Sequence, residues 1–387
     1  MKNILIVITN FRHGGTNRSL KNLLSIIDHE KYSVDVFAMD HFGPYSNQLP
    51  NCILLKPNKL IDPLIACFDD TKGMARIRSL SMKIIRNLLQ TTGFNLTNYL
   101  FKRKANQFSK GNYDAVIAFS EGAPTYLVYH VKNNNKIAWI RCDYGSYLKY
   151  NNCPNEAAIY ASYDSVVCVS EFTKEVFCKY ISSLSDRVYS IHNIVDAHFM
   201  QHAADERISD PRFTNDQFNI ISIGRIDQVK RFSKIPQIVR LLIDRGCQFK
   251  WYLIGDGSQS TELTEFKNNI KKFNVANSFF WLGAKDNPYP YIAQSDLLVT
   301  TSSSEACPNV INEAKILHIP VVCTNFGSAP EFIEDGVNGY IAPIEQLADK
   351  IELLIKDKQE YNKIKKNLAE FIYDNEQILK RLYRILP

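Results

Sequence analysis

The chain lacks any run of about 18 consecutive apolar residues, the length that a helix needs to cross a bilayer. Its nine cysteines include no C-x-x-C pair, and several stand in apolar, strand-like runs. This pattern argues against a zinc site and a disulfide framework, and it fits a reducing cytosol. Residues 1–10 have a short apolar core but no small-residue cleavage site, which favours a first strand over a signal peptide.

Two recognition motifs are also absent. The first strand is followed by the pair Gly14 and Gly15 and not by G-x-G-x-x-G, so the dinucleotide fingerprint is missing. Paired glycines still let the backbone approach a ligand closely, although a simple tight turn is an equal alternative. No nucleic-acid-binding motif accompanies the basic residues, so we expect no nucleic-acid partner.

Negative charge is scarce in the first half of the chain. Residues 1–200 carry 23 Lys and Arg but 16 Asp and Glu, whereas residues 201–387 carry 23 and 24. Apolar residues between 80 and 89 alternate with Lys83 and Arg86, which predicts a basic amphipathic helix. Such a helix can lie on an anionic membrane, and an ordinary helix with a solvated face is the alternative. The cations that contribute most to the excess are Arg76, Arg78, Lys83, Arg86, Lys102, Arg103 and Lys104.

Two series of apolar, strand-like runs alternate with helical periodicity, which predicts parallel sheets covered on both faces. We therefore expect an α/β protein with two Rossmann-like, doubly wound domains facing a cleft. The predicted N-terminal domain covers residues 1–196, and a polar linker covers 197–217. The predicted second domain covers 218–372, and a helix in 373–387 is expected to pack back on the first domain. The predicted strands are 4–9, 33–39, 114–119, 137–140, 165–169, 189–191, 218–223, 249–254, 279–282, 296–300 and 320–323. Residues 41–75 are expected to be irregular, and residues 258–273 are expected to form a helix.

The stretch 302–314 places two acids, Glu305 and Glu313, on either side of a predicted helix start. We expect Pro308 at the first helical position, Glu305 in the preceding loop and Glu313 in the second turn. A helix N-terminus binds phosphate, and a carboxylate can accept two hydrogen bonds from sugar hydroxyls. The alternative is a pair of surface acids flanking a helix cap.

Two cations, Arg225 and Lys230, follow the first strand of the second predicted domain. Arginine presents a planar fork to phosphate oxygens and lysine a point charge. Together they could neutralise a diphosphate without a metal, although a solvated basic turn would have the same composition.

The order of these motifs resembles the GT-B glycosyltransferases, in particular the retaining enzymes of family 4 (glycosyl transferases group 1). The strongest motifs are G-R-I-D-x-x-K-R at 224–231, I-G-D-G at 254–257, E-x7-E at 305–313 and P-E-F-I-E-D-G-V-N-G-Y at 330–340. Weaker matches are the Gly14–Gly15 loop, V-S-E-F-T-K at 169–174 and H-N-I-V-D at 192–196.

The resemblance implies that the domain of residues 1–196 binds the acceptor and that the domain of residues 218–372 binds the nucleotide-sugar. It also implies roles for individual residues. Arg225, Lys230 and Glu305 would form the catalytic set, in which the two cations stabilise the departing diphosphate and Glu305 contacts the donor sugar. The other donor-binding residues would be Gly15 near the diphosphate, Gly283 and Ala284 near the base, Asn309 and Val310 through their N–H groups, and Glu313 at the ribose. No D-x-D motif occurs, so we expect neither a metal nor any other cofactor.

Two positions depart from the family pattern. Where relatives often carry W-I-H-x-D, this chain has Trp139-Ile140-Arg141-Cys142-Asp143. Arg141 cannot serve as a base, but with Gly14 and Asp143 it could form an acceptor or sugar pocket. Ala306 stands where glycine is usual, and its methyl group could narrow the sugar pocket.

The resemblance therefore predicts transfer of a sugar from a nucleotide-sugar, most simply a UDP-sugar, with retention of configuration. The expected acceptor is a glycan or lipid-linked glycan in surface polysaccharide synthesis. The expected place is the cytoplasm, at the inner face of the membrane. A nucleotide-sugar epimerase of the same architecture and an inactive partner subunit are the alternatives. The intact set Arg225, Lys230, Glu305 and Glu313 argues against the inactive subunit, whereas Arg141 favours it.

Overall fold

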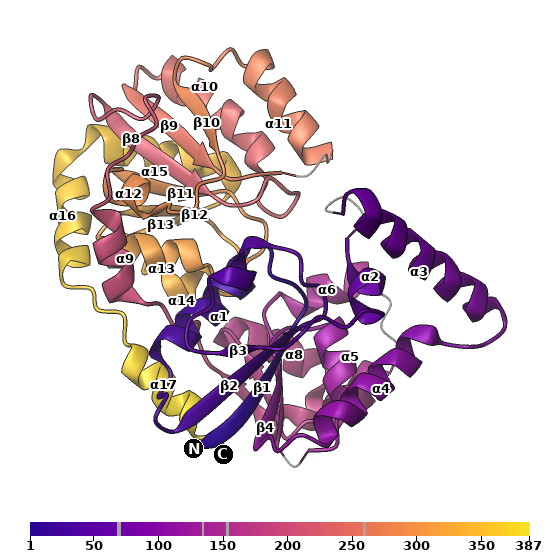
Figure 1. Ribbon diagram of the computed structural model, residues 1–387. Helices are drawn as coiled ribbons and strands as arrows, with labels where there is room; N and C mark the ends of the chain where they lie inside the picture. Colours follow the sequence, from indigo (N-terminus) through magenta and orange to yellow (C-terminus); the bar gives the residue numbers. More distant parts are fainter. Residues whose placement is uncertain (68–70, 134, 152–154, 258–260) are drawn as a thin grey trace. The chain divides into compact units, whose positions relative to one another are not determined.

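The computed structural model describes residues 1–387 except 68–70, 134, 152–154 and 258–260. The chain divides into two compact units (Figure 1). One unit comprises Met1–Ile194 together with Asn375–Pro387, and the other comprises Val195–Asp374. The start of the helix predicted over 258–273 lies outside the described residues.

The first unit is built on a parallel sheet with strand order β3-β2-β1-β4-β5-β6-β7. Each strand pairs in parallel with its neighbours, and the strand order reverses between β1 and β4. The strands are β1 (Lys2–Ile8), β2 (Tyr32–Ala38), β3 (Ile53–Leu54), β4 (Ala115–Ala118), β5 (Lys136–Ile140), β6 (Ser165–Cys168) and β7 (Val188–Ser190).

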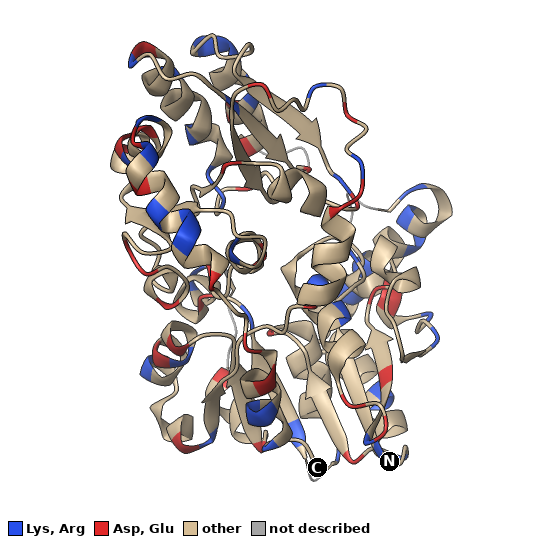
Figure 2. Cartoon of the chain, turned by 90° about the vertical axis from the view of Figure 1, so that its left-hand side faces the viewer, with Lys and Arg blue, Asp and Glu red and all other residues tan. Residues whose placement is uncertain are grey.

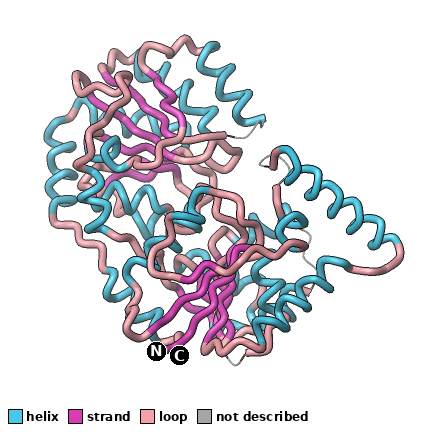
Figure 3. The backbone as a smooth tube through the Cα atoms, in the orientation of Figure 1, coloured by secondary structure: helices cyan, strands magenta, loops and turns pink. Residues whose placement is uncertain are grey.

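Helices cover both faces of this sheet, as the continuous burial of its central strands requires (Figure 3). Helix α3 extends from the edge of the unit, beyond α2 and α4 (Figure 1). The helices are α1 (Gly15–Ile26), α2 (Ile61–Ile65), α3 (Gly73–Thr91), α4 (Leu96–Ser109), α5 (Ala123–Tyr129), α6 (Tyr144–Tyr150), α7 (Glu156–Ala161), α8 (Glu171–Tyr180) and α17 (Asn375–Tyr383).

Helix α17 comes from the end of the chain and packs on the first unit. The ring of Tyr383 stacks on Tyr32 with centroids 5.6 Å apart. Its hydroxyl accepts a hydrogen bond from the Asp28 N–H at 3.0 Å. Near the C-terminus, the Asn135 side chain donates to the Ile385 carbonyl at 3.3 Å.

The second unit repeats the plan of the first. Its parallel sheet has the order β10-β9-β8-β11-β12-β13, and this order reverses between β8 and β11. The strands are β8 (Phe218–Ile223), β9 (Phe249–Ile254), β10 (Phe279–Gly283), β11 (Leu297–Thr300), β12 (Val321–Thr324) and β13 (Gly339–Ala342). The helices are α9 (Ala197–Ala204), α10 (Ile235–Asp244), α11 (Thr261–Lys272), α12 (Tyr289–Ala293), α13 (Asn309–Ile316), α14 (Ala329–Phe332), α15 (Leu347–Lys356) and α16 (Lys358–Ala369).

Residues 197–217 differ from the predicted linker because they belong to the second unit. Met200 and Ala203 of α9 and the later Phe213 are buried in a core cluster with Tyr252. The Phe213 and Tyr252 rings lie 4.5 Å apart. The segment is mostly polar, so its composition indicated a linker, but its few apolar residues are enough to anchor it in the core of the second unit.

The predicted fold class is confirmed: each unit is a Rossmann-like, doubly wound α/β domain. The arrangement of the two domains about a cleft stays a prediction. Residues 41–75, which we expected to be irregular, contain β3, α2 and the start of α3. β3 and α2 are too short to display a period, and the proline and glycine residues of this segment are typical of loops. In the described part of the chain, no helix combines the length and apolar character needed to cross a membrane.

Candidate functional site

The predicted cations and acids of the second unit follow β8 and β11, the two strands between which the sheet order reverses. In open α/β sheets, ligands bind outside the carboxyl ends of the strands at this reversal. Residues 224–231 follow β8, and residues 301–308 follow β11. The topology therefore places both predicted donor-binding loops at one ligand-binding position.

Hydrogen bonds join the two loops directly. The Ser303 N–H donates to the Val229 carbonyl at 2.8 Å, and the Thr301 hydroxyl donates to the Lys230 carbonyl at 2.6 Å. The Arg231 guanidinium donates to the Thr301 carbonyl at 2.8 Å and to the Ser302 carbonyl at 2.9 Å. Arg231 thus has a positioning role that the sequence motif alone did not reveal.

Lys230 and Glu305 form an ion pair across these loops, with Nζ and Oε1 separated by 2.5 Å. Their side chains are 20% and 15% exposed, respectively, so the pair is only partly solvated. The Ser302 hydroxyl donates to the same Glu305 oxygen at 2.7 Å. The Ser328 hydroxyl fixes the Glu305 carbonyl at 2.8 Å. Both side chains are therefore held in place before any donor binds.

Arg225 lies at the exposed tip of the loop after β8, with 72% of its side chain accessible. Its Nη2 is 3.4 Å from Asp227 Oδ2. The other oxygen of Asp227 accepts hydrogen bonds from the N–H groups of Val229 at 3.1 Å and Lys230 at 3.0 Å. Asp227 thus shapes the loop that carries both predicted phosphate-binding cations.

The glycines of the motifs at 224–231 and 254–257 allow the loops after β8 and β9 to pack backbone against backbone. A Cβ on Gly255 would lie 1.8 Å from the Gly224 carbonyl oxygen. A Cβ on Gly257 would lie 2.9 Å from that of Ile226. The Ile226 N–H donates to the Asp256 carbonyl at 2.8 Å. The two motifs are therefore adjoining parts of one surface.

Helix α13 carries the second acid. Pro308 is its N-cap in an extended conformation, and Asn309 is the first helical residue, so the prediction of Pro308 at that position is wrong by one residue. Asn309 and Val310 lie in the first turn, where backbone N–H groups and the helix dipole favour an anion. Glu313 lies one turn later and is 1% exposed. As predicted, it stands in the second turn while Glu305 stays in the loop.

Lys315 also anchors α13 to the second unit. Its ammonium donates to the Phe332 carbonyl at 2.7 Å and lies 4.2 Å from the centre of the Phe371 ring. Burial lowers the pKa of Lys315 to about 8, because the charged form loses solvation. This contact holds the helix next to the site without using a predicted site residue.

Gly283 ends β10, and Ala284 follows it. Gly283 has a φ of +75°, which favours glycine, and its carbonyl accepts from the Gly255 N–H at 3.0 Å. Arg212 donates to the carbonyls of Trp281 at 3.0 Å and Leu282 at 3.4 Å. The end of β10, where the base is predicted to bind, is therefore supported by the segment predicted as a linker.

Asp210 strengthens that support. Its Oδ2 lies 2.7 Å from an Arg212 nitrogen and 2.9 Å from Lys285 Nζ. The hydrogen bonds from Arg212, the largest influence, and from Lys285 hold the pKa of the Asp210 carboxyl well below its usual range. Nothing in the sequence pattern singled out these three residues, which are brought together only by the fold.

Gly14, Gly15, Arg141 and Asp143 belong to the first unit. Gly14 is the N-cap of α1, and Gly15 is its first residue. No described heavy atom lies within 4 Å of a Cβ built on Gly14, beyond its chain neighbours. Protein packing in the described residues therefore does not require glycine at 14, which leaves room for the predicted approach of a ligand.

Arg141 is fixed at the carboxyl edge of the first sheet. Its Nε donates to the Phe119 carbonyl at 2.8 Å, and its Nη1 donates to Asn193 Oδ1 at 2.8 Å. The guanidinium carbon lies 3.7 Å from the centre of the Phe119 ring. The structure thus places a permanent, oriented cation where the family pattern has histidine.

Asp143 caps helix α6, since its Oδ1 accepts from the Gly145 N–H at 3.1 Å and the Ser146 N–H at 3.4 Å. Its role in an acceptor or sugar pocket stays a prediction, and this cap is a structural function for the same carboxylate. Ala306 is buried, and its influence on the sugar pocket likewise stays a prediction.

Comparison with known families finds a match within the second unit. Residues 204–371 match the family described as Glycosyl transferases group 1. An uncharacterised glycosyltransferase of Methanocaldococcus jannaschii is 24% identical over 235 residues, which cover 58% of this chain and 55% of the relative. The chain thus spans about half the length of this relative.

Two further relatives are matched over most of their length. The amylovoran biosynthesis glycosyltransferase AmsD of Erwinia amylovora is 23% identical, with 100% of both chains covered. The N-acetylgalactosamine-N,N'-diacetylbacillosaminyl-diphospho-undecaprenol 4-alpha-N-acetylgalactosaminyltransferase of Campylobacter jejuni is 25% identical over 89% of this chain and 87% of its own. The family match and the names of these relatives both describe glycosyltransferases.

Solved structures confirm the fold. HepE of Anabaena, in complex with UDP and glucose, superposes with a TM-score of 0.74 and 18% sequence identity. The match covers 99% of this chain and 98% of HepE. At this identity the likeness shows the fold of the two Rossmann-like domains and no shared substrate.

Proposed function

We propose that this chain, whose residues 204–371 form a glycosyl transferases group 1 domain, transfers a sugar from a nucleotide-sugar to a glycan or lipid-linked glycan. The donor we propose is a UDP-sugar, and the pathway is surface polysaccharide assembly. The named role of AmsD in amylovoran biosynthesis and the lipid-linked acceptor in the name of the Campylobacter enzyme support this proposal. The single observation that carries it is the Lys230–Glu305 pair at the strand reversal.

The pair suits a diphosphate leaving group. An ammonium has three donors, so Lys230 can keep its bond to Glu305 and also donate to phosphate oxygens. Arg225, on the same loop, adds a second cation that can swing toward the diphosphate because it is exposed. Charge that develops on the departing diphosphate is then stabilised by groups already in position.

We propose retention of the anomeric configuration, as the family resemblance implies. The bond from the anomeric carbon to the diphosphate oxygen breaks, and a bond to the acceptor oxygen forms on the same face of the sugar. The acceptor hydroxyl proton passes to the departing phosphate oxygen. Lys230 and Arg225 assist by holding that oxygen and its neighbours, and no metal or other cofactor is part of the proposal.

Changing Glu313 to Gln tests the donor site. We expect Kd for UDP to rise about 10- to 100-fold, because the ribose hydroxyls lose hydrogen bonds to a charged acceptor. Isothermal titration with UDP measures this change. Glutamine preserves the volume of a buried side chain, so the fold should survive. Glu334→Gln, an exposed change in the same unit, is the control. Equal UDP affinity in the wild type and Glu313→Gln would remove Glu313 from the site.

We further propose that helix α3 makes a peripheral contact with the inner face of the cell membrane. The exposed fractions of its apolar side chains are 74% for Met74, 57% for Ile77, 57% for Ile84 and 63% for Leu88. Helix α3 contains cations and no acidic residue, whereas helices such as α15 and α16 carry residues of both signs (Figure 2). A basic helix with an exposed apolar face has the composition of an interfacial helix.

Flotation with vesicles of phosphatidylcholine and phosphatidylglycerol tests this contact. The double change Ile84→Gln and Leu88→Gln should weaken vesicle binding at least about thirtyfold, since two apolar side chains no longer enter the lipid. Ile372→Gln removes an apolar side chain of the second unit that is even more exposed, at 84%, and serves as the control. No vesicle binding by the wild-type protein at low salt would refute the membrane contact while leaving the UDP measurement unaffected.

A further inference from the structure

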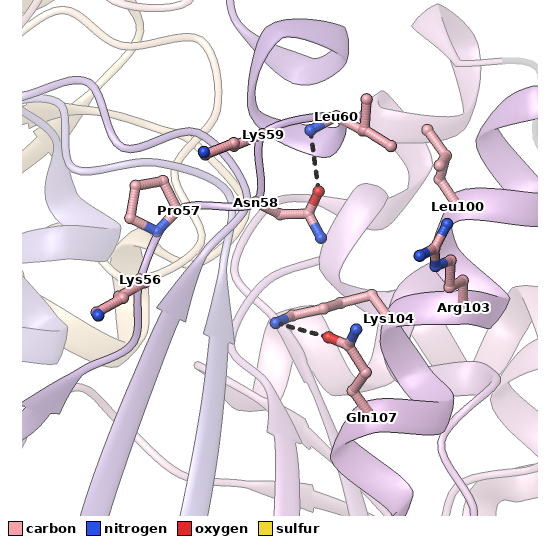
Figure 4. Close-up of a pocket in the computed structure, with 9 residues that line it drawn as sticks. All are labelled: Lys56, Pro57, Asn58, Lys59, Leu60, Leu100, Arg103, Lys104 and Gln107. Carbon is pink, nitrogen blue, oxygen red and sulfur yellow. Dashed lines mark hydrogen bonds between the residues drawn. The ribbon is translucent and has the colours of Figure 1, made fainter.

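The first unit contains a basic hollow between the loop 56–60 and helix α4 (Figure 4). Its volume is about 340 Å³, within the usual range of roughly 300–1,000 Å³ for small-molecule sites. Three apolar residues line part of it. Its polar lining residues are Lys56, Asn58, Lys59, Arg103, Lys104 and Gln107, and no acidic residue is among the lining residues.

The cations of this hollow lack acidic partners in the described part of the chain. None of the ion pairs found there includes Lys56, Lys59, Arg103 or Lys104. The surrounding sequence explains this, because residues 71–113 contain nine Lys and Arg and no Asp or Glu. Cations gathered without counter-ions create a positive potential that favours an anionic ligand.

Lys104 is held in the hollow by aromatic rings. Its ammonium lies 4.6 Å from the ring centres of both Phe37 and Phe108, and it donates to Gln107 Oε1 at 3.3 Å. Partial burial lowers the pKa of Lys104, because the charged form is incompletely solvated. An anion beside this ammonium would stabilise its charged form and so compensate for the hydration lost on burial.

The opposite wall is held by hydrogen bonds. Asn58 Oδ1 accepts from the N–H groups of Leu60 at 3.0 Å and Ile61 at 3.1 Å. Its amide nitrogen points toward the side occupied by Lys104 and Arg103 (Figure 4). From α3, Arg78 donates to the Lys59 carbonyl at 3.4 Å. Lys56 and Lys59 lie on the outer flank of the loop in this view, where they add to the potential.

We infer that this hollow binds a phosphate group through Arg103, Lys104 and the amide of Asn58. The arginine fork can hold two phosphate oxygens, while the ammonium and the amide donate to others. The site is separate from the predicted donor site, whose cations belong to the second unit. The phosphate can come from a lipid, because α3 with its exposed apolar side chains is attached to the same loop, or from a water-soluble phosphorylated molecule.

Two binding experiments on the full chain test this site. The first is flotation with phosphatidylcholine vesicles containing phosphatidic acid, and the second is calorimetric titration with inorganic pyrophosphate. The double change Arg103→Gln and Lys104→Gln should weaken the relevant binding about thirtyfold, as expected for two cations acting at a phosphate. The double change Lys149→Gln and Lys179→Gln removes two exposed charges of the same unit outside the hollow and is the matched control.

The outcomes separate the two sources. Selective loss of vesicle binding in the Arg103 and Lys104 variant assigns the phosphate to a lipid. Selective loss of pyrophosphate binding, with vesicle binding unchanged, assigns it to a water-soluble molecule. Equal effects of the two double variants in both experiments, or no effect, would overturn the phosphate site. Arg103→Glu alone, at an exposed position, repeats the test without disturbing the packing of Lys104, and neither experiment requires transferase activity.

Discussion

Replacing Lys230 by Met is expected to lower kcat for sugar transfer by about 10²- to 10³-fold. Methionine keeps the apolar stem but removes the ammonium that lies 2.5 Å from Glu305. The departing diphosphate then loses a charge that is fixed beside it in the wild type. In addition, the change leaves Glu305 as a partly buried carboxylate without its cation, which destabilises the loop that carries it. The measurement is the rate of UDP release from the donor in the presence of acceptor.

Lys234→Met is the matched control for this prediction. Lys234 comes four residues after Lys230, is half exposed, and lies 3.6 Å from Glu265 in a surface ion pair. Exposed pairs of this kind contribute about 0–1 kcal/mol to stability, so Lys234→Met should keep both fold and kcat. If Lys230→Met retained kcat within about twofold of the wild type, Lys230 would not be part of the diphosphate clamp.

Replacing Gly255 by Ala is expected to lower the free energy of unfolding of the second unit by about 3 kcal/mol or more. The added methyl group would lie 1.8 Å from the Gly224 carbonyl oxygen, and the obstacle is backbone that cannot rotate away. The loops after β8 and β9 would have to separate. Because Arg225 and Lys230 stand on the first of these loops, UDP binding should weaken together with stability.

Urea unfolding followed by tryptophan fluorescence measures this effect, since two of the three tryptophans, Trp251 and Trp281, lie in the second unit. Gly246→Ala is the control: its φ is +74°, but a Cβ there meets no described heavy atom within 4 Å. Alanine at that φ should cost about 1–2 kcal/mol. Equal destabilisation by the two changes would show that the close approach at Gly255 is relieved at little cost.

Much of the fold could be predicted because buried parallel strands leave a direct signal. β8 and β9 have the predicted bounds, since each is a continuous apolar run next to polar loop residues. The segment 41–75 gave no comparable signal: β3 has two residues and α2 has five, too few to display a period. Residues 197–217 were misassigned because α9 is anchored by a few apolar side chains in a polar segment.

The residues of the candidate site could be predicted in kind but not in their contacts. Charged side chains that follow apolar strands, in an order that resembles the glycosyltransferase motifs, indicate Arg225, Lys230, Glu305 and Glu313. No sequence pattern indicates the residues that hold these four side chains in place. Ser302 and Ser328 orient Glu305, and Asp210 joins Arg212 to Lys285, but serine and aspartate at such positions are common in any loop.

By itself, the sequence determined the alternation of strands and helices, the parallel sheets and the chemical types of the side chains in the predicted donor site. These properties are local, because apolar continuity, loop composition and helix starts depend on neighbouring residues. Only the tertiary structure decided that Lys230 meets Glu305, 75 positions away along the chain. The physical reason is that β11 pairs with β8, so the loops after these two strands meet at the strand reversal. The same long-range packing placed α17 on the first unit and set Arg141 against Phe119.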